Sequence, residues 1–182
     1  LLPFPPVTLP TLRRLLVATA LVQSFHMLEH VLQVMQVSLD IAPAHGLIGA
    51  FDLEWIHFFY NTAYFILLIV LFVTIALQRV LTSLIPYRRS IFSTFLLLVF
   101  VQSYHAVEHV VKLEQHLATG LQGTPGILGA HIDLVWFHFF LNLAVYLPLL
   151  FALYGLRHIL WQEDRFAAPC SVSPCPWASP VY

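Results

Sequence analysis

Residues 23–31, QSFHMLEHV, return at residues 102–110 as QSYHAVEHV, so the chain carries one polar pattern twice inside apolar segments. A second pair follows each copy at nearly the same distance, DLEWIHFFYN at residues 52–61 and DLVWFHFFLN at residues 133–142. The Gln, Ser, His and Glu of the first pair and the Asp, Trp, His and Asn of the second are kept, whereas the apolar positions change freely. The repeat therefore preserves chemistry rather than packing, which indicates a shared functional site.

The composition of the chain is that of an integral membrane protein. Of its 182 residues, 59% are hydrophobic and only 9% are charged. The mean hydropathy of +0.82 lies outside the range of soluble globular domains. A helix needs about 20 apolar residues to cross the hydrocarbon core of a bilayer. Four segments meet this requirement, at residues 12–39, 50–77, 90–117 and 131–160.

The duplicated pattern divides the chain into two helical hairpins. Each hairpin holds one copy of both motifs, and a loop containing glycine and proline separates its two helices. The predicted boundaries are an N-terminal segment at residues 1–11, hairpins at 12–78 and 90–160, a linker at 79–89 and a tail at 161–182. An even number of spans gives both halves the same orientation. The predicted fold is therefore all-α, an up-down-up-down bundle of four transmembrane helices.

The placement of the basic residues predicts the topology. The net charge is only -1, but every Lys and Arg except Lys112 lies at a chain end or between the second and third predicted helices. Under the positive-inside rule, both termini and the middle loop of this multi-pass protein are expected in the cytoplasm. The expected partners are the lipid bilayer and either other subunits of a membrane complex or a second copy of the chain. The absence of a basic patch argues against nucleic acid.

The polar residues of each predicted helix share one face. In residues 23–33 they fall within an arc of about 120°, and the second copy repeats this arc. On the second and fourth helices, the motif histidine is followed four residues later by an asparagine on the same face. Counted from the outer loops, the histidines of all four helices lie at similar depth. We expect them to meet at one level, in the outer half of the bilayer.

This cluster of ionisable side chains predicts a metal site. A polar or ionisable side chain inside the bilayer costs several kcal/mol unless it is paired. Two imidazoles four residues apart on one helix can bind the same ion. The candidate ligands are His26, Glu29, His30, His57, His105, Glu108, His109 and His138. They suit two mononuclear sites or one dinuclear site that the two glutamates bridge. Iron is the metal expected first, with zinc, copper and manganese as alternatives, because imidazole and carboxylate bind all four.

A further set of polar side chains is expected to support the ligands. Imidazoles that bind metals are oriented by hydrogen bonds from neighbouring amides and carboxylates. The residues expected in this role are Gln23, Gln102, Asp52, Asp133, Asn61 and Asn142. The two aspartates also begin their predicted helices, so capping the helix is the main role expected of them.

The metal site leaves two functions open. One is an oxidative enzyme that acts on a lipid-soluble substrate, with the metals activating oxygen. The ligand types are similar to those in the histidine boxes of membrane di-iron desaturases and hydroxylases, from which the spacing here departs. The other is a metal-bearing subunit of a larger membrane complex, which fits a small chain with almost no soluble portion.

Two further hypotheses involve no metal–glutamate site. The cofactor of the first is haem or a chlorophyll-type pigment, bound by His30 and His109 as axial ligands inside the membrane. The second hypothesis is a hydrogen-bonded polar network that holds the helices together or conducts protons without any cofactor. Glutamine, serine or asparagine would serve such a network, so the repeated His-x-x-Glu-His pattern favours a metal.

Overall fold

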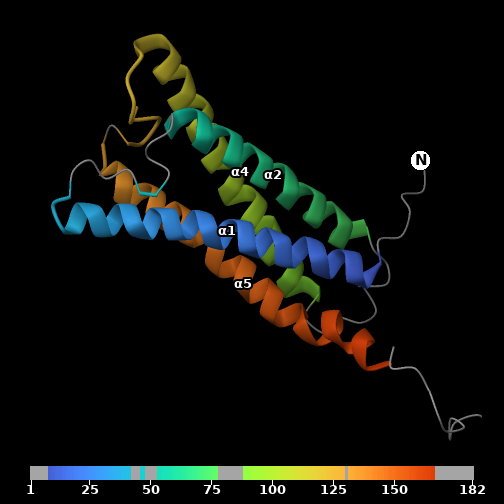
Figure 1. Cartoon of the computed structure of the whole chain (residues 1–182). Helices are drawn as coiled ribbons and strands as arrows, with labels where there is room; N and C mark the ends of the chain where they lie inside the picture. Colours follow the sequence, from blue (N-terminus) through green and yellow to red (C-terminus); the bar gives the residue numbers. More distant parts are fainter. Residues whose placement is uncertain (1–7, 42–45, 48–52, 78–87, 130, 167–182) are drawn as a thin grey trace, which may run out of the picture.

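A computed structural model describes residues 8–41, 46–47, 53–77, 88–129 and 131–166 and contains four helices (Figure 1). They are α1 (Leu9–Ser38), α2 (Leu53–Leu77), α4 (Arg88–Thr119) and α5 (Leu134–Phe166). Each helix is long and apolar enough to cross a membrane, and the described residues include no strand. The prediction of an all-helical chain with four such helices is confirmed.

The helix ends differ from the predicted ones where a side chain caps the helix. Thr8 begins α1 because its Oγ1 accepts a hydrogen bond from the Thr11 N–H at 3.4 Å. Asp133 begins α5 because its Oδ1 accepts from the N–H groups of Val135 and Trp136, each at 3.0 Å. As a result α5 begins after residues 131–133, which were expected inside the helix. At its other end α5 continues to Phe166, beyond the predicted end at residue 160.

The helices pack so that each half of the chain contacts the other. α1 lies mainly against α5, and α2 lies mainly against α4, while α4 also contacts α5 and α1 contacts α2. In Figure 1, α1 and α4 run toward one end of the molecule, and α2 and α5 return. The Arg13 guanidinium on α1 donates to the carbonyl of Leu160 on α5 at 3.3 Å, which ties the beginning of α1 to the end of α5.

The interior changes from apolar to polar along its length. An apolar core occupies the end where α1 begins and α5 ends. Its buried side chains are Leu12, Leu16, Ala20, Tyr64, Leu68, Leu71, Ile75, Ile91, Phe95, Leu98, Val145, Leu149, Ala152, Leu156 and Leu160. The buried histidines and amides follow these residues on α1 and α4 and precede them on α2 and α5. The polar interior therefore lies toward the loops that join α1 to α2 and α4 to α5.

Candidate metal centre

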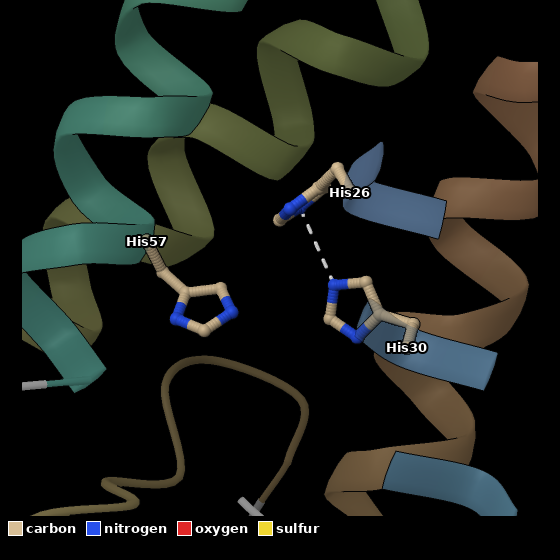
Figure 2. A group of neighbouring side chains, drawn as sticks. All are labelled: His26, His30 and His57. Atoms are coloured by element: carbon tan, nitrogen blue, oxygen red, sulfur yellow. Dashed lines mark hydrogen bonds between the residues drawn. The ribbon is translucent and has the colours of Figure 1, made fainter. Parts of the chain in front are cut away.

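Six buried imidazoles from all four helices form two groups of three. Triad 1 contains His26 and His30 of α1 and His57 of α2 (Figure 2). Triad 2 contains the equivalent residues of the second half: His105, His109 and His138. Within each triad, one possible ligand atom per residue lies within 4.8 Å of the others. The structure thus brings together every histidine that the sequence motifs singled out.

Triad 1 has ring nitrogens at the separation expected of metal ligands. The Nε2 atoms of His26 and His30 are 3.3 Å apart, and two nitrogens bound to a tetrahedral ion with bonds of about 2.05 Å would also be about 3.3 Å apart. The Nδ1–H of His30 donates to Oε1 of Gln33 at 2.9 Å. Because this bond places the proton of the neutral ring on Nδ1, Nε2 of His30 carries the lone pair. This lone pair accepts the hydrogen bond from Nε2 of His26, and it is the one that would bind an ion.

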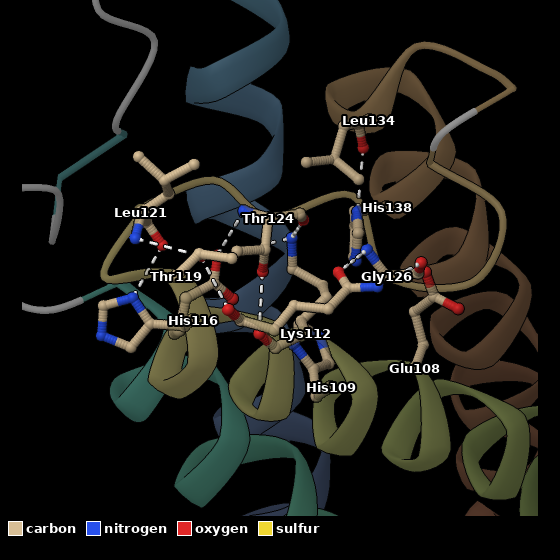
Figure 3. A network of polar contacts seen from close by, with 12 residues as sticks. Glu108, His109, Lys112, His116, Thr119, Leu121, Thr124, Gly126, Leu134 and His138 are labelled. Carbon is tan, nitrogen blue, oxygen red and sulfur yellow. Dashed lines mark hydrogen bonds and ion pairs between the residues drawn. The ribbon is translucent and has the colours of Figure 1, made fainter.

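Triad 2 has the same arrangement with different hydrogen bonds. The Nε2 atoms of His105 and His109 are 3.0 Å apart. His138 donates its Nδ1–H to the Leu134 carbonyl at 2.8 Å, one turn earlier on α5 (Figure 3). Among the described residues, Nε2 of His138 and Nδ1 of both His105 and His109 have no hydrogen-bond partner. Three buried ring nitrogens of triad 2 therefore lack a partner.

The two triads touch each other through three pairs of rings. The rings of His57 and His109 are stacked with their centroids 5.6 Å apart, and those of His30 and His138 are stacked at 6.1 Å. In both pairs the ring planes are inclined by 14°. The third pair, formed by the equivalent residues His26 and His105, has its centroids 6.4 Å apart. The six rings therefore form one cluster.

A layer of amides lies next to the histidines on the side of the apolar core. Gln23 donates to Oδ1 of Asn142 at 3.1 Å, and Gln102 donates to Oδ1 of Asn61 at the same distance. Both asparagines donate in turn to the backbone carbonyl of a triad histidine four residues earlier, at 2.9 Å. These four amides bond to one another and to the backbone of the turns that carry His57 and His138. Their predicted role in orienting the rings of bound imidazoles stays a prediction.

Of the two aspartates of the motifs, Asp133 has the capping role that was expected of it. Asp133 is exposed and caps α5, so the observed bonds of its side chain are those of a helix cap. Asp52 lies outside the described residues.

Both glutamates of the motifs bind loop backbone. Oε2 of Glu29 accepts the N–H of Leu47 at 2.9 Å, and Oε1 of Glu108 accepts the N–H of Ile127 at 3.0 Å. Tyr104 donates a further hydrogen bond to Oε2 of Glu108 at 3.0 Å. Although both glutamates were predicted as ligands, the histidine groups do not include them. These contacts show that each carboxylate ties the loop that follows its helix back to that helix.

The loops approach the glutamates through glycines that the sequence analysis did not single out. Gly46 and Gly126 adopt φ values of +68° and +70°, in the left-handed region that favours glycine. A Cβ atom at either position would collide with the carboxylate of Glu29 or Glu108, respectively. Their N–H groups donate to the side chains of Gln36 and Gln115, each at 2.8 Å. These glutamines and glycines also recur in both halves, so the repeat contained the signal.

One part of the site breaks the similarity of the two halves. The Lys112 ammonium lies 3.5 Å from the Glu54 carboxylate, and both side chains are buried. Lys112 also donates to the Thr124 carbonyl (Figure 3). The Thr124 N–H donates to Glu54 at 3.1 Å. In the aligned motifs, the positions of Lys112 and Glu54 correspond to Gln33 and Val135. Neither charge recurs, so the repeat did not indicate this ion pair.

The chain matches no protein-family model, no curated protein and no solved structure. The function must therefore be argued from the geometry of this cluster.

Proposed function

We propose that the chain is a membrane-embedded metal protein in which each histidine triad holds one transition-metal ion. The observation that carries this proposal is the pair of buried groups of three histidines, built from equivalent residues of the two repeats. In this proposal the repeats are related by an approximate two-fold axis along the membrane normal. Since the rings of the two triads are in contact, the two ions form a dinuclear centre.

The distribution of polar and apolar side chains supports insertion into a membrane. The described surface exposes many large apolar residues, such as Leu21, Phe100 and Phe151. The interior buries two triads of histidines, four amides and an ion pair. Soluble proteins seldom expose large contiguous apolar surfaces, whereas ionisable residues of membrane helices face the bundle interior. The basic flanks of the helices support, through the positive-inside rule, an orientation with the chain ends in the cytoplasm. In that orientation the metal centre lies in the outer half of the bilayer.

The unpaired ring nitrogens favour a metal over a purely structural network. Buried polar groups in native proteins are nearly always hydrogen-bonded, and a half-satisfied network is less stable than an apolar core. Nε2 of His138 has no partner among the described residues, while the Nδ1–H of the same ring is already bonded. A metal ion supplies the partner that this lone pair requires.

The contacts among the rings favour metal ions over a tetrapyrrole. A haem or chlorophyll-type pigment is held by one imidazole on a face of a flat macrocycle. Here each ring lies against several others, and His109 has His57, His105 and His138 within 5.6 Å of it, measured between ring centroids. A macrocycle would have to separate these rings, whereas single ions fit between their nitrogen atoms.

The ligand set suggests the kind of metal and its chemistry. With the glutamates bonded to the loops, each site offers three neutral imidazoles, which suit iron, copper or zinc better than manganese. Three protein ligands leave a fourth position for water, oxygen or substrate, as in catalytic rather than structural sites. This open position suits an oxidative enzyme with a lipid-soluble substrate, and a metal-bearing subunit of a membrane complex is the alternative role.

Elemental analysis with a visible spectrum tests the proposal. Purified wild-type protein, loaded with iron, copper or zinc, should hold two ions per chain and show no strong Soret-type band. His57→Phe combined with His138→Phe removes one ligand from each triad and keeps an aromatic ring in its place, so it should lose most of the metal. His158→Phe, at an exposed position, is the control and should keep both ions. A chain that binds no metal, or a Soret-type band that the double variant loses, would contradict the proposal.

A further inference from the structure

We propose that the two triads differ in affinity: triad 1 fills first and holds its ion tightly, whereas triad 2 is the exchangeable site. Gln33 is the positioning residue responsible for this difference. The inference rests on the proposed function, because it requires that both triads bind metal.

The difference between the two triads comes from one pair of equivalent positions in the two halves of the chain. Gln33 and Lys112 each lie three residues after the last histidine of the first motif. In the first half, the Gln33 oxygen accepts the Nδ1–H of His30 at 2.9 Å. This bond holds the ring in the tautomer whose Nε2 binds metal.

The second half has no such acceptor. Lysine has only donor hydrogens at its end, and the Lys112 ammonium is engaged by the Thr124 carbonyl and the Glu54 carboxylate. Figure 3 shows this side chain extending toward the loop that carries Thr124. Nδ1 of His109 has no hydrogen-bond partner within the described part of the chain. The ring of His109 is therefore not held in the metal-binding tautomer by a bond from its own helix.

The consequence for metal binding follows from known effects of such bonds. An acceptor on the second ring nitrogen orients an imidazole ligand and raises its basicity, and its loss lowers metal affinity by about 10–100-fold. The missing acceptor on Nδ1 of His109 therefore weakens triad 2 relative to triad 1.

Variants that isolate each triad give the two affinities directly. His138→Phe leaves triad 1 complete, and His57→Phe leaves triad 2 complete. In both variants an aromatic ring remains against the histidine of the other triad, which preserves the stacked pairs with His30 and His109. The metal-depleted proteins in lipid nanodiscs are titrated with Co²⁺ against a competing chelator, and the visible bands of bound Co²⁺ report occupancy. The dissociation constant of the His57→Phe protein should be about 10–100-fold higher than that of the His138→Phe protein.

A second set of variants tests the role of Gln33 itself. Placed in the His138→Phe background, Gln33→Leu removes the acceptor and should raise the dissociation constant of triad 1 by about 10–100-fold. Gln33→Glu keeps an acceptor oxygen and should retain tight binding, so the two variants separate loss of the acceptor from substitution at this position.

The reciprocal change is made in the His57→Phe background. Lys112→Gln together with Glu54→Gln removes both charges, keeps an acceptor for the Thr124 N–H and gives His109 an amide neighbour. This combination should tighten triad 2.

The outcomes separate this inference from the function on which it rests. If neither single-triad variant binds Co²⁺, and wild type does not bind it either, the proposed function itself fails. If wild type binds two ions and both triads have the same affinity, only the inference fails. If Gln33→Leu leaves the tight binding of metal by triad 1 unchanged, Gln33 is not the positioning residue.

Discussion

The imidazoles of His57 and His109 are stacked with their centroids 5.6 Å apart, although one belongs to the first half of the chain and the other to the second. His30 and His138 form the equivalent pair at 6.1 Å. Each triad therefore has two rings stacked against rings of the other triad. This contact is the reason to regard the six histidines as one centre.

The first prediction concerns the glutamates. Since Glu29 and Glu108 accept hydrogen bonds from loop N–H groups, an amide oxygen can replace the carboxylate. The double variant Glu29→Gln with Glu108→Gln should keep two metal ions per chain by elemental analysis. Loss of metal from this variant would show that the carboxylates are ligands, as the sequence alone suggested.

The second prediction concerns the loop between α4 and α5. Gly123 and Gly126 have φ values of +69° and +70°, so alanine costs about 1–2 kcal/mol of backbone strain at either position. Only at Gly126 would the added Cβ also collide with Glu108 and Lys112, because nothing lies within 4 Å at Gly123. Gly126→Ala should therefore expose the loop amides to hydrogen exchange more than Gly123→Ala does. Equal exchange in the two variants would contradict the observed loop position.

The sequence was sufficient to predict the helices and the level at which the histidines meet. Periodicity identifies the inward face of a helix, and the repeat identifies which inward residues matter. The sequence was not sufficient to predict the hydrogen bonds of Glu29 and Glu108, which lie on the same face as the histidines. Their partners belong to loops, and helical periodicity does not predict how a loop folds back.

The pair Lys112 and Glu54 was missed for a different reason. It joins α4 to α2, which come from different halves, and neither residue has a charged equivalent in the other half. A repeat reveals what the two halves share, so it cannot reveal a contact that exists only once.

The third prediction concerns the amide layer. Gln23 and Asn142 join α1 to α5 through a buried hydrogen bond of 3.1 Å. Hydrogen bonds between membrane helices contribute about 0.6 kcal/mol on average and up to about 1.7 kcal/mol. A double-mutant cycle with Gln23→Leu and Asn142→Leu, measured by reversible unfolding in mixed micelles, should give a coupling energy in that range. The control cycle of Gln23→Leu with Thr94→Val should be additive, because the Thr94 hydroxyl bonds to the Ser90 carbonyl of its own helix.

The fourth prediction concerns topology. Gln122 is exposed in the loop after α4, which we place outside the cell. Gln122→Cys, in a chain with Cys170→Ser and Cys175→Ser, should react with a membrane-impermeant maleimide applied to intact cells. A chain that keeps the natural cysteines of the tail and lacks the new one should react only after the cells are opened. The reverse pattern would overturn the assigned orientation.

X-ray absorption of the zinc-loaded protein tests the central claim most directly. We expect each zinc ion to have a first shell of nitrogen or oxygen at about 2.0–2.1 Å, with the outer-shell scattering of three imidazoles per ion. His57→Phe with His138→Phe should reduce the imidazole scattering of any zinc that remains bound. A first shell containing sulfur, or scattering from a single imidazole per ion in the wild type, would contradict the account of two triads that each hold one metal ion.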